Sequence, residues 1–260
     1  MALDVDGTLL TTDGVITDRV RTALAHAEES GWHVVIVTGR PLVVTMPVVE
    51  QLGLGEHVVV GNGATVVHLP SGEVLHQASL PGRLVREAIA AAREVLPSLG
   101  LAVTTPRGFF REPDFDKVAP LSVMEGAEVL DAMPFADETV HAARLFDHRI
   151  DARDVHAAEA PVAPAGVAVT LSGLVGTVEL APPDTHKASG LARLCELLGV
   201  ARADVVAFGD GLNDHEMLVW AGHGVAMGNA EDATKAIADE VTATNDDDGV
   251  AVVMERLLGA

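Results

Sequence analysis

Several residue types that would mark a class of protein are scarce in this chain of 260 residues. The only cysteine is Cys195, so no disulfide can form within the chain, which suits a reducing cytosol. Because Cys195 stands in an apolar helical pattern, we expect it to pack in the core. No uninterrupted apolar run reaches membrane-spanning length, and no secretory signal pattern opens the chain. We therefore expect a cytoplasmic protein that makes no membrane contact.

Positive charge is also scarce. Lys and Arg together number 17 against 38 Asp and Glu, and the formal net charge is −21. No basic patch stands out, so binding to nucleic acid is disfavoured. Lysine occurs only at positions 117, 187 and 235, so a lysine near a polar motif draws attention. The 11 histidines lack the close helical pairing that is typical of a zinc site.

The most informative stretch that is present runs from Ala2 to Leu10. Asp4 and Asp6 follow a short apolar run and are followed by a Gly-Thr pair, which indicates a buried strand that opens into a loop. Residues i and i+2 of a strand point the same way, roughly 7 Å apart, so both carboxylates are expected to face one small volume. Like charges that close need a cation, a proton or solvent, and a hard divalent cation such as Mg²⁺ fits best.

Two other interpretations of this stretch are a calcium-binding loop and a solvated turn. A calcium-binding loop is excluded because, counted from Asp4, the sixth position is Leu9 instead of Gly and the twelfth is Val15 instead of Glu. The residues of this stretch alone do not exclude a solvated turn, and the choice between a solvated turn and a cation site depends on the rest of the chain.

Apolar strands alternate with helical patterns at both ends of the chain, which predicts an α/β fold with a parallel sheet. Pro47 is expected to kink or interrupt the second helix. The expected elements are a helix over 18–30, a strand over 33–37, a helix over 41–52, a strand over 57–60, a hairpin of 65–69 and 73–77, a helix over 187–198, a strand over 204–208, a helix over 217–221, a strand over 224–227, a helix over 231–238, a strand over 240–244 and a helix over 250–258.

The middle of the chain has α+β character and is expected to form an inserted second domain. Its expected elements are helices over 84–96 and 151–159 and strands over 101–105, 141–146, 166–171 and 177–180, with poor periodicity between Pro106 and Pro134. The expected domains are residues 1–81 and 183–260 for the two parts of the first domain and 82–182 for the inserted one.

Polar residues follow several of the expected parallel strands, at the edge where open α/β sheets bind their ligands. These residues are Asp4, Asp6, Thr38, Gly39, Asn62, Asp210, Asn213 and Asp214. Carboxylates, a small hydroxyl, an amide and one nearby lysine, Lys187, suit phosphoryl transfer, in which Mg²⁺ is held by few carboxylates and a carboxylate can act as the nucleophile.

The individual signals differ in specificity. Thr38-Gly39-Arg40 alone is more often a strand-to-helix turn, and Lys187 alone is more often a solvated helix start. A dinucleotide-binding loop at Gly61-Asn62-Gly63 is rejected because Val66 stands where the third glycine should be. The segment Asp210–Asp214 is more specific, with three polar side chains in five residues after a buried strand.

Together these motifs resemble the haloacid dehalogenase superfamily of phosphohydrolases, specifically its Cof-type branch with a type IIB α/β cap. The resemblance spans the chain except the interior of the cap. It rests on residues 4–10 (DVDGTLL), 37–40 (VTGR), 185–191 (THKASGL) and 209–214 (GDGLND), and further on 225–230 (VAMGNA) and 244–251 (TNDDDGVA). Two features depart from the branch: only three residues precede Asp4, which makes the first strand short, and Ala188 follows Lys187 where the branch commonly has Gly.

The resemblance implies a Rossmann-like parallel-sheet core with an inserted α+β cap. It implies that Asp4 is the nucleophile and that Asp6 protonates the leaving oxygen and then activates water. It also implies that Mg²⁺ is held by the Asp4 carboxylate, the Asp6 backbone carbonyl and Asp210, with Asp214 either bound to the ion or one contact away.

The same resemblance implies that Thr38, the Gly39 amide, Lys187 and Asn213 hold the phosphoryl oxygens. The expected activity is Mg²⁺-dependent hydrolysis of small phosphate esters, such as sugar phosphates, through an aspartyl-phosphate. The alternatives are a phosphomutase on the same fold and a non-catalytic binder of phosphorylated ligands.

Five residues of the expected cap are candidates for contacting the substrate beyond its phosphate. Taken one at a time, the aromatic ones are more simply explained as cap core and the charged ones as surface. They are Phe109, Phe110, Arg111, Arg144 and His148.

Overall fold

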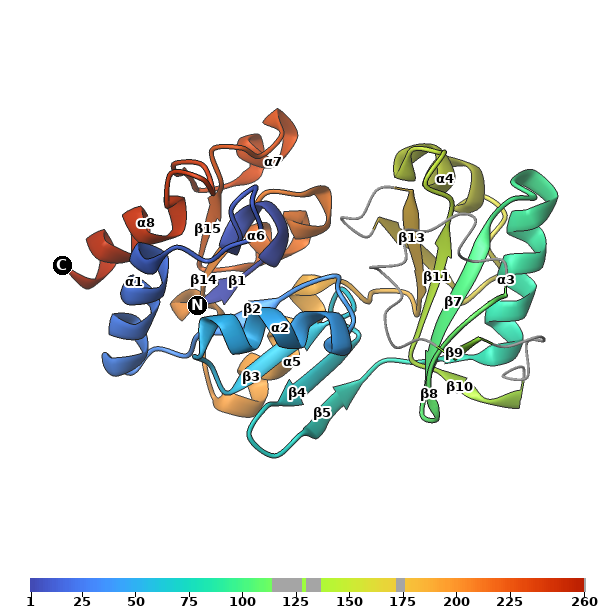
Figure 1. The fold of residues 1–260 in the computed structure, drawn as a ribbon, viewed down its shortest axis with the longest axis horizontal. Coiled ribbons are helices and arrows are strands. Elements are labelled where there is room, and N and C mark those ends of the chain that lie inside the picture. Colours follow the sequence, from blue (N-terminus) through green and yellow to red (C-terminus); the bar gives the residue numbers. More distant parts are fainter. Residues whose placement is uncertain (114–127, 130–136, 172–175, 260) are drawn as a thin grey trace. The chain divides into compact units, whose positions relative to one another are not determined.

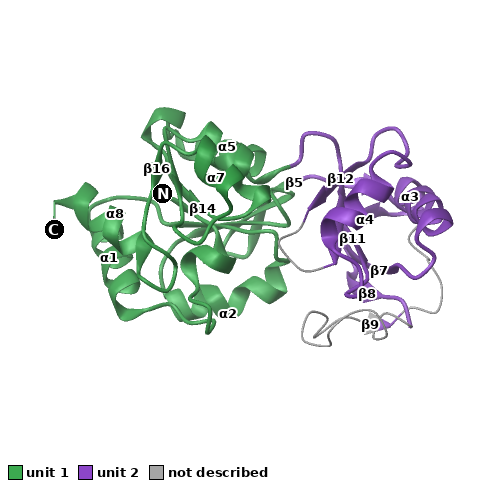
Figure 2. Ribbon diagram, turned by 90° about the horizontal axis from the view of Figure 1, so that it is seen from above, with its two compact units in different colours: residues 1–76, 186–260 green, residues 77–185 purple. Residues whose placement is uncertain are grey.

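The computed structural model describes residues 1–113, 128–129, 137–171 and 176–259, and the chain divides into two compact units (Figures 1 and 2). Unit 1 comprises residues 1–76 and 186–260, and unit 2 comprises residues 77–185. Relative to the sequence-based boundaries, unit 2 starts five residues earlier (77 against 82) and ends three later (185 against 182). None of the described helices is both long and apolar enough to cross a membrane.

Unit 1 is built on one sheet, whose strand order is β16-β15-β14-β1-β2-β3-β4-β5. From β16 to β3 neighbouring strands are parallel, and β4 pairs with β3 in the antiparallel direction. The strands are β1 (Ala2–Leu3), β2 (Val35–Val37), β3 (His57–Val60), β4 (Thr65–His68), β5 (Glu73–Gln77), β14 (Val206–Gly209), β15 (His223–Ala226) and β16 (Glu240–Val241).

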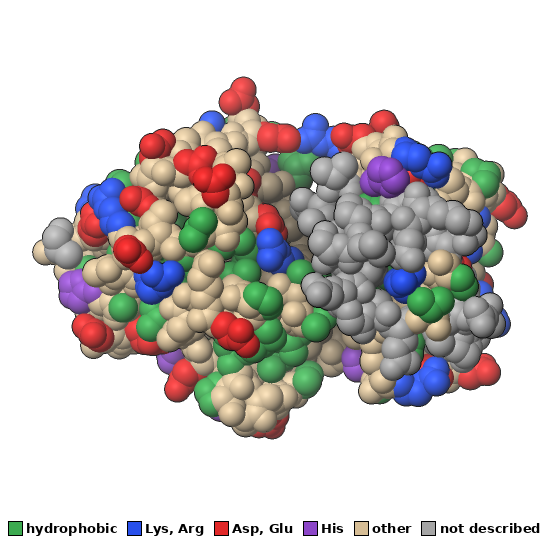
Figure 3. All heavy atoms as spheres, viewed as in Figure 1, with side chains coloured by type: hydrophobic (Ala, Val, Ile, Leu, Met, Phe, Trp, Pro, Cys, Tyr) green, Lys and Arg blue, Asp and Glu red, His purple; other side chains and the backbone are tan. Residues whose placement is uncertain are grey.

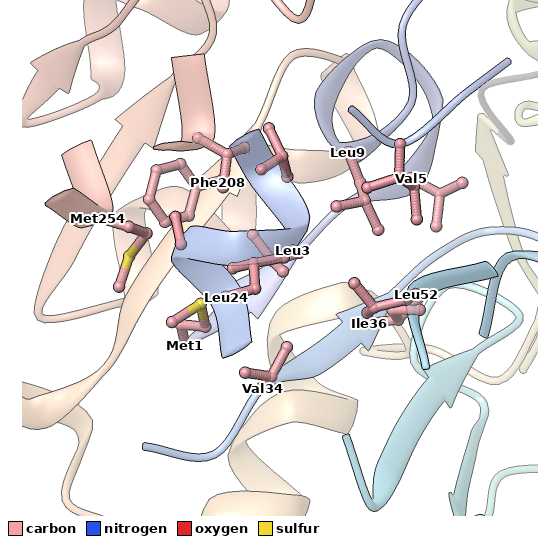
Figure 4. Packing of buried hydrophobic residues seen from close by; sticks show 14 of the residues in the cluster. Met1, Leu3, Val5, Leu9, Leu24, Val34, Ile36, Leu52, Phe208 and Met254 are labelled. Atoms are coloured by element: carbon pink, nitrogen blue, oxygen red, sulfur yellow. The ribbon is translucent and has the colours of Figure 1, made fainter. Parts of the chain in front are cut away.

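Helices cover both faces of this sheet because successive strand residues point to opposite faces. Leu3 and its parallel neighbours Ile36 and Phe208 pack on one face against α1, α2 and α8 (Figure 4), whereas Ala2 and Ala207 pack on the other face against α5 and α6. The helices are α1 (Asp18–Glu29), α2 (Leu42–Leu52), α5 (Lys187–Leu198), α6 (His215–Trp220), α7 (Asp232–Ile237) and α8 (Gly249–Leu258). Cys195 lies buried in this second core, as expected.

Of the two outcomes expected at Pro47, a kink or an interruption, the interruption does not occur, since α2 runs as one element from Leu42 to Leu52. The first strand ends at Leu3, and residues Val5–Leu9 form a tight turn instead of continuing the strand, with Gly7 at a φ of 74°. Asp4 and Asp6 therefore do not lie on one strand face.

Unit 2 contains a six-stranded sheet of order β12-β13-β11-β7-β8-β9, with α3 and α4 supplying residues to its apolar core. Its pairs are antiparallel except β8 with β9. The elements are β6 (Leu80–Pro81), α3 (Gly82–Val95), β7 (Gly100–Thr105), β8 (Gly108–Arg111), β9 (Glu128–Val129), β10 (Thr139–Val140), β11 (Ala142–Phe146), α4 (Ala152–Glu159), β12 (Ala168–Leu171) and β13 (Thr177–Ala181). Of these, β6, β8, β9 and β10 were not expected, and most of the stretch with poor periodicity lies outside the described residues.

The candidate cap residues divide between core and surface. Phe110 packs in the apolar core of unit 2 and His148 is exposed, as the simpler explanation of each predicted. Phe109 and Arg111 are half-buried. For Arg144 the surface expectation was wrong: it is 3% exposed and forms an ion pair with Glu179, because the two lie directly opposite each other on β11 and β13.

The surface carries most of the charge of the chain. On the face drawn in Figure 3, acidic side chains are scattered among basic and polar ones and do not gather in one patch. The formal charge of −21 therefore supports no particular binding surface on that face and is consistent with a role in solubility.

Candidate active site

The polar motifs of unit 1 meet because their strands are neighbours in the sheet. The order β14-β1-β2-β3 is parallel throughout, so all four carboxyl ends lie at the same edge. Asp4 follows β1, Thr38 follows β2 and Asp210 follows β14. This edge is where an open parallel sheet binds ligands.

Three carboxylates gather at this edge. Asp4, Asp210 and Asp214 each offer one oxygen within 4.8 Å of the others, a spacing at which they could share a metal ion. Asp4 is 6% exposed and Asp214 is fully buried, whereas Asp210 is half-buried. Among the described residues this is the one group of its kind.

The ammonium of Lys187 joins two of the carboxylates. Lys187 Nζ donates to Asp4 Oδ1 at 2.5 Å and to Asp214 Oδ1 at 2.7 Å, and the side chain is fully buried. Lys187 is thus not a solvated helix start, although that was the simpler explanation of the residue alone. Three carboxylates facing one ammonium leave an excess of negative charge in a buried place.

The electrostatics follow from burial and from this excess. Burial raises the pKa of Asp4 well above its usual value, and the neighbouring charges of Asp214 and Asp210 raise it further, while Lys187 acts in the opposite direction. Burial and Asp214 raise the pKa of Asp210 to about 6. Burial alone would lower the pKa of Lys187, but Asp214 and Asp4 outweigh it and raise that pKa, so Lys187 stays protonated.

Asp214 organises the loop after β14. Its Oδ2 accepts hydrogen bonds from the backbone N–H groups of Asp210 (3.1 Å) and Gly211 (2.9 Å), while Oδ1 accepts from Lys187. Gly209 lies so close that an added Cβ would stand 2.5 Å from the Asp214 Cβ. The spacing of the Gly-Asp-Gly-Leu-Asn-Asp motif is therefore explained by hydrogen bonds between the carboxylate of its last residue and backbone N–H groups near its start.

Lys187 reaches the cluster because the start of α5 is anchored. His186 caps the helix by accepting the Ser189 N–H at Nδ1 (3.2 Å). Gly63, just after β3, packs directly on the first turn of α5: an added Cβ there would lie 2.1 Å from the His186 carbonyl oxygen, and one on Gly190 would lie 2.6 Å from Gly63. Both glycines are thus required by close backbone approach.

Asp6 is not one of the three carboxylates whose oxygens lie within 4.8 Å of one another, because the chain turns after Asp4. Its side chain pairs with Arg40 in a bidentate geometry, with Nε–Oδ2 at 2.8 Å and Nη2–Oδ1 at 2.5 Å. Asp6 therefore does not project from the same strand as Asp4, and that part of the expectation was wrong. The charge of Asp6 nevertheless acts on Asp210. The carboxylate of Asp6 is half exposed, at 46%, and remains accessible to a ligand or to water.

The remaining expected residues lie at the neighbouring strand ends. Thr38 is 1% exposed and its Oγ1 accepts the Arg40 N–H at 3.1 Å. Asn213 donates to Asn62 Oδ1 at 3.0 Å, and the Asn62 side chain would stand 3.0 Å from a Cβ added to Gly39. Gly39 and Asn213 thus lie against the same Asn62 side chain, which joins the ends of β2, β3 and β14.

Sequence reasoning missed three contributions to this region. Thr8 donates to Asp210 Oδ1 at 3.2 Å, Arg40 pairs with Asp6, and Asn229 donates to the Gly7 carbonyl oxygen at 2.8 Å. Thr8, Arg40 and Asn229 all stood in motifs that the resemblance identified, so position in a motif was an available signal. Their partners could not be deduced from spacing, because they lie tens to hundreds of residues away.

The donor set fits a hard divalent cation. Carboxylate oxygens are the ligands that Mg²⁺ prefers, and three carboxylates with one ammonium leave a net charge of −2 that such an ion would neutralise. Burial and the neighbouring charge of Asp214 raise the pKa of Asp210, and a cation bound beside it would counter both effects. The arrangement could hold a cation beside a buried carboxylate, with hydroxyl, amide and ammonium donors close by.

Comparison with known proteins gives one consistent result. The family model described as haloacid dehalogenase-like hydrolase matches residues 1–254. The chain is 31% identical to the phosphatase YwpJ of Bacillus subtilis over 99% of both chains. It is 33% identical to the 5-amino-6-(5-phospho-D-ribitylamino)uracil phosphatase YitU of the same organism, over 96% of this chain and 94% of YitU.

A solved structure agrees with the sequence relatives. A haloacid dehalogenase-like hydrolase from Bacteroides thetaiotaomicron is 30% identical and superposes with a TM-score of 0.81, covering 98% of both chains. The sheet order, the motifs at its carboxyl edge and the match over nearly the whole length agree. The chain belongs to the haloacid dehalogenase-like hydrolase family.

Proposed function

We propose that this chain is a Mg²⁺-dependent phosphatase that hydrolyses small phosphorylated metabolites, such as sugar phosphates, through an aspartyl-phosphate on Asp4. The observation that carries the proposal is the buried cluster of three carboxylates around Lys187 at the carboxyl edge of the parallel sheet. The relatives named above are phosphatases, which supports the reaction class.

Asp4 is the proposed nucleophile. It is buried beside a fixed ammonium, so its carboxylate can approach a phosphate ester without a competing water shell. One Asp4 oxygen forms a bond to phosphorus while the bond from phosphorus to the leaving oxygen breaks. Asp210, Asp4 and the Asp6 backbone carbonyl would hold Mg²⁺, with Asp214 bound to it or one contact away. When bound, the ion supplies positive charge that offsets the repulsion between phosphate and carboxylate.

Asp6 is the proposed acid and base. Its exposed carboxylate, outside the buried cluster, can give a proton to the leaving oxygen and later take one from water. That water attacks phosphorus, and the bond from phosphorus to the Asp4 oxygen breaks. Inorganic phosphate is released and the free Asp4 carboxylate is regenerated. One carboxylate therefore serves both half-reactions.

The neighbouring strand ends supply the proposed phosphate contacts. Lys187 offers a fixed positive charge, and Thr38, the Gly39 amide and Asn213 offer hydroxyl and N–H donors. Such donors stabilise the charge that spreads over the equatorial oxygens during phosphoryl transfer. Unit 2 is proposed to be the cap that selects the leaving group.

The test is phosphate release from a panel of small phosphate esters, with Mg²⁺ and with a chelator. The variants are Asp4→Asn, Asp210→Ala and, as a matched control, Asp13→Asn, whose carboxylate is exposed in the loop that follows the same turn. We expect Asp4→Asn to lower turnover by about a thousandfold or more, as removal of a nucleophile does elsewhere. We expect Asp210→Ala to abolish the Mg²⁺-dependent part while the protein stays folded, and Asp13→Asn to behave as the unmodified chain.

The outcomes separate the alternatives. Full activity of Asp4→Asn would refute the nucleophile, and full Mg²⁺-dependent activity of Asp210→Ala would refute the metal assignment. Turnover that needs a bisphosphorylated activator would favour the phosphomutase. Ester binding without any turnover would favour the non-catalytic binder.

A further inference from the structure

The turn that carries Asp6 depends on contacts from outside itself. It spans Val5–Leu9, with Gly7 at a φ of 74°, and its two ends are joined by the Leu10 N–H to the Val5 carbonyl oxygen at 3.0 Å. A turn of only five residues has little stiffness of its own. The position of the Asp6 backbone therefore depends on whatever holds this turn, while Arg40 pairs with the end of the side chain.

One set of contacts comes from the carboxylate cluster. Thr8 Oγ1 donates to Asp210 Oδ1 at 3.2 Å, and a Cβ added to Gly7 would stand 2.2 Å from Asp210 Oδ2. This side of the turn is thus pressed against the proposed metal-binding residues.

The second set of contacts comes from two asparagines, which we call the asparagine bridge: Asn229, after β15, and Asn245, between β16 and α8. Asn229 Nδ2 donates to the Gly7 carbonyl oxygen at 2.8 Å, and Asn229 Oδ1 accepts the backbone N–H of Asn245 at 3.0 Å. Asn245 Nδ2 donates to the Leu10 carbonyl oxygen at 2.9 Å. The bridge thus holds two backbone carbonyls by hydrogen bonds, that of Gly7 in the middle of the turn and that of Leu10 just after it.

The burial of the two asparagines indicates what each does. Asn245 is 9% exposed and anchors the bridge, whereas Asn229 is exposed. An exposed side chain fills no space in the core, so packing does not explain why both ends of its amide meet backbone groups. An amide offers a donor and an acceptor in one plane, which the link between Gly7 and Asn245 requires and which a carboxylate cannot supply.

We propose that Asn229, supported by Asn245, is a positioning residue for Asp6. By holding the Gly7 carbonyl, Asn229 fixes the backbone of the turn from which the Asp6 side chain projects. The inference rests on the proposed function, because it gives Asn229 a role only if Asp6 transfers protons. It concerns proton transfer and not phosphate binding, since neither asparagine of the bridge is hydrogen-bonded to Lys187 or Asp4.

The test uses Asn229→Asp, which keeps the size and the acceptor but removes the donor and places an oxygen against the Gly7 carbonyl. The substrate is p-nitrophenyl phosphate, whose leaving group departs without needing a proton. Formation of the aspartyl-phosphate should stay within about twofold of the unmodified chain, because Asp6 is not needed for that step. Its hydrolysis should slow by about tenfold, because Asp6 must activate water, and this is the size expected when one hydrogen bond is lost.

The expected signature is therefore a burst of p-nitrophenol and a higher steady-state level of phosphorylated enzyme, with kcat and KM lowered together and kcat/KM unchanged. A merely structural role would move both steps together and would give no burst. The matched control is Asp246→Ala, since Asp246 is also exposed and holds the same loop through Thr12, but farther from Asp6. Asp246→Ala should show no burst, and the melting temperatures of both variants should fall by a similarly small amount, because each loses hydrogen bonds of an exposed side chain.

Two results would overturn the inference: Asn229→Asp without a burst, or an equal burst in Asp246→Ala. The proposed function fails in a different way. If the unmodified chain and Asp6→Asn form no phosphorylated enzyme at all, or if Asp4→Asn still forms it, the reaction scheme itself is wrong and the inference falls with it.

Discussion

The two units bury charge in different ways. Unit 1 buries Asp4, Asp214 and Lys187 beside a half-buried Asp210, which is three carboxylates for one ammonium. In unit 2, Arg144 and Glu179 are buried, at 3% and 4% exposed, as a pair of opposite charges across neighbouring strands. Unit 2 also buries Asp147, which is paired with Arg149, and Glu159.

The difference shows how a site can be told from a structural contact. The pair in unit 2 is balanced, with Arg144 Nε at 2.7 Å and Nη2 at 2.5 Å from Glu179 Oε1. The cluster in unit 1 has excess negative charge, which costs stability and which a bound cation would offset. Buried charge alone is therefore weak evidence for function, whereas an imbalance of buried charge at a strand edge is stronger evidence.

The largest effect is expected when Lys187 is replaced by Met. The change leaves Asp4 and Asp214 buried without their ammonium, so the free energy of unfolding of unit 1 should fall by about 3–5 kcal/mol and turnover should be lost. Trp32 and Trp220 are the only tryptophans and both lie in unit 1, so their fluorescence during urea unfolding reports this unit selectively.

The control for this change is Lys235→Met on α7, outside the cluster, which should leave unfolding and turnover unchanged. Asp4→Asn sharpens the comparison, because it should abolish turnover yet raise the melting temperature by removing one of the repelling carboxylates. If Lys187→Met is as stable as the unmodified chain, or if Asp4→Asn is less stable than it, the cluster does not carry the destabilising excess of negative charge described above.

The second effect concerns Arg144 in unit 2. Arg144→Met should lower the stability of unit 2 by about 3 kcal/mol because Glu179 is left buried without this partner, whereas the double change Arg144→Met, Glu179→Leu should recover most of the loss. Hydrogen exchange of the β11 and β13 amides measures both. No such recovery is expected in unit 1, since removing Lys187 and Asp4 together still leaves Asp210 and Asp214.

The double variant also tests Arg144 as a substrate contact. An unchanged KM for every ester in the panel would indicate a structural pair. A KM raised for some esters and not for others would show that the pair contributes to selection of the leaving group, and the balance of charge would then be a poor guide to function.

The sequence predicted the elements that have strong periodicity. The helices α1, α3, α5 and α8 and the strands β2, β3, β14 and β15 each form within a few residues of the expected ranges, because each pairs an apolar pattern with a clear start or stop. The edge at which the polar residues gather also followed, since parallel strands align their carboxyl ends. The family resemblance was confirmed by the family model over residues 1–254.

Most predictions that failed concerned features that depend on contacts between residues distant in the sequence. The direction of Asp6 is set by a turn with Gly7 at positive φ and by Arg40, 34 residues away. The burial of Arg144 follows from its register opposite Glu179, which no local pattern reveals. The strand β8 was missed because its apolar signal is only two phenylalanines long.

The smallest effect is expected at Glu159, which breaks the balance of charge in unit 2. Glu159 lies one turn after Val155 on the buried face of α4 and is 2% exposed. Within the described part of the chain, neither of its carboxylate oxygens has a hydrogen-bond partner. Burial raises the pKa of Glu159 from 4.5 to about 7. This carboxyl therefore stays protonated at a pH where an unfolded one has lost its proton.

The sign of the pH dependence follows from proton binding. Between pH 4.5 and about 7 the folded state holds a proton that the unfolded state has released, so the stability of unit 2 falls as pH rises through this window and stays lower above it.

Glu159→Gln removes the ionisation, so it should stabilise unit 2 by about 2 kcal/mol at pH 8 and change little at pH 4. Protection of the β13 amides against hydrogen exchange at the two pH values measures this, with Glu87→Gln on the exposed side of α3 as the control. Equal protection in Glu159→Gln and the unmodified chain at pH 8 would mean that a partner stabilises the charged form of Glu159. Such a result would make Glu159 resemble the clustered carboxylates of unit 1 and would remove the main contrast between the two units.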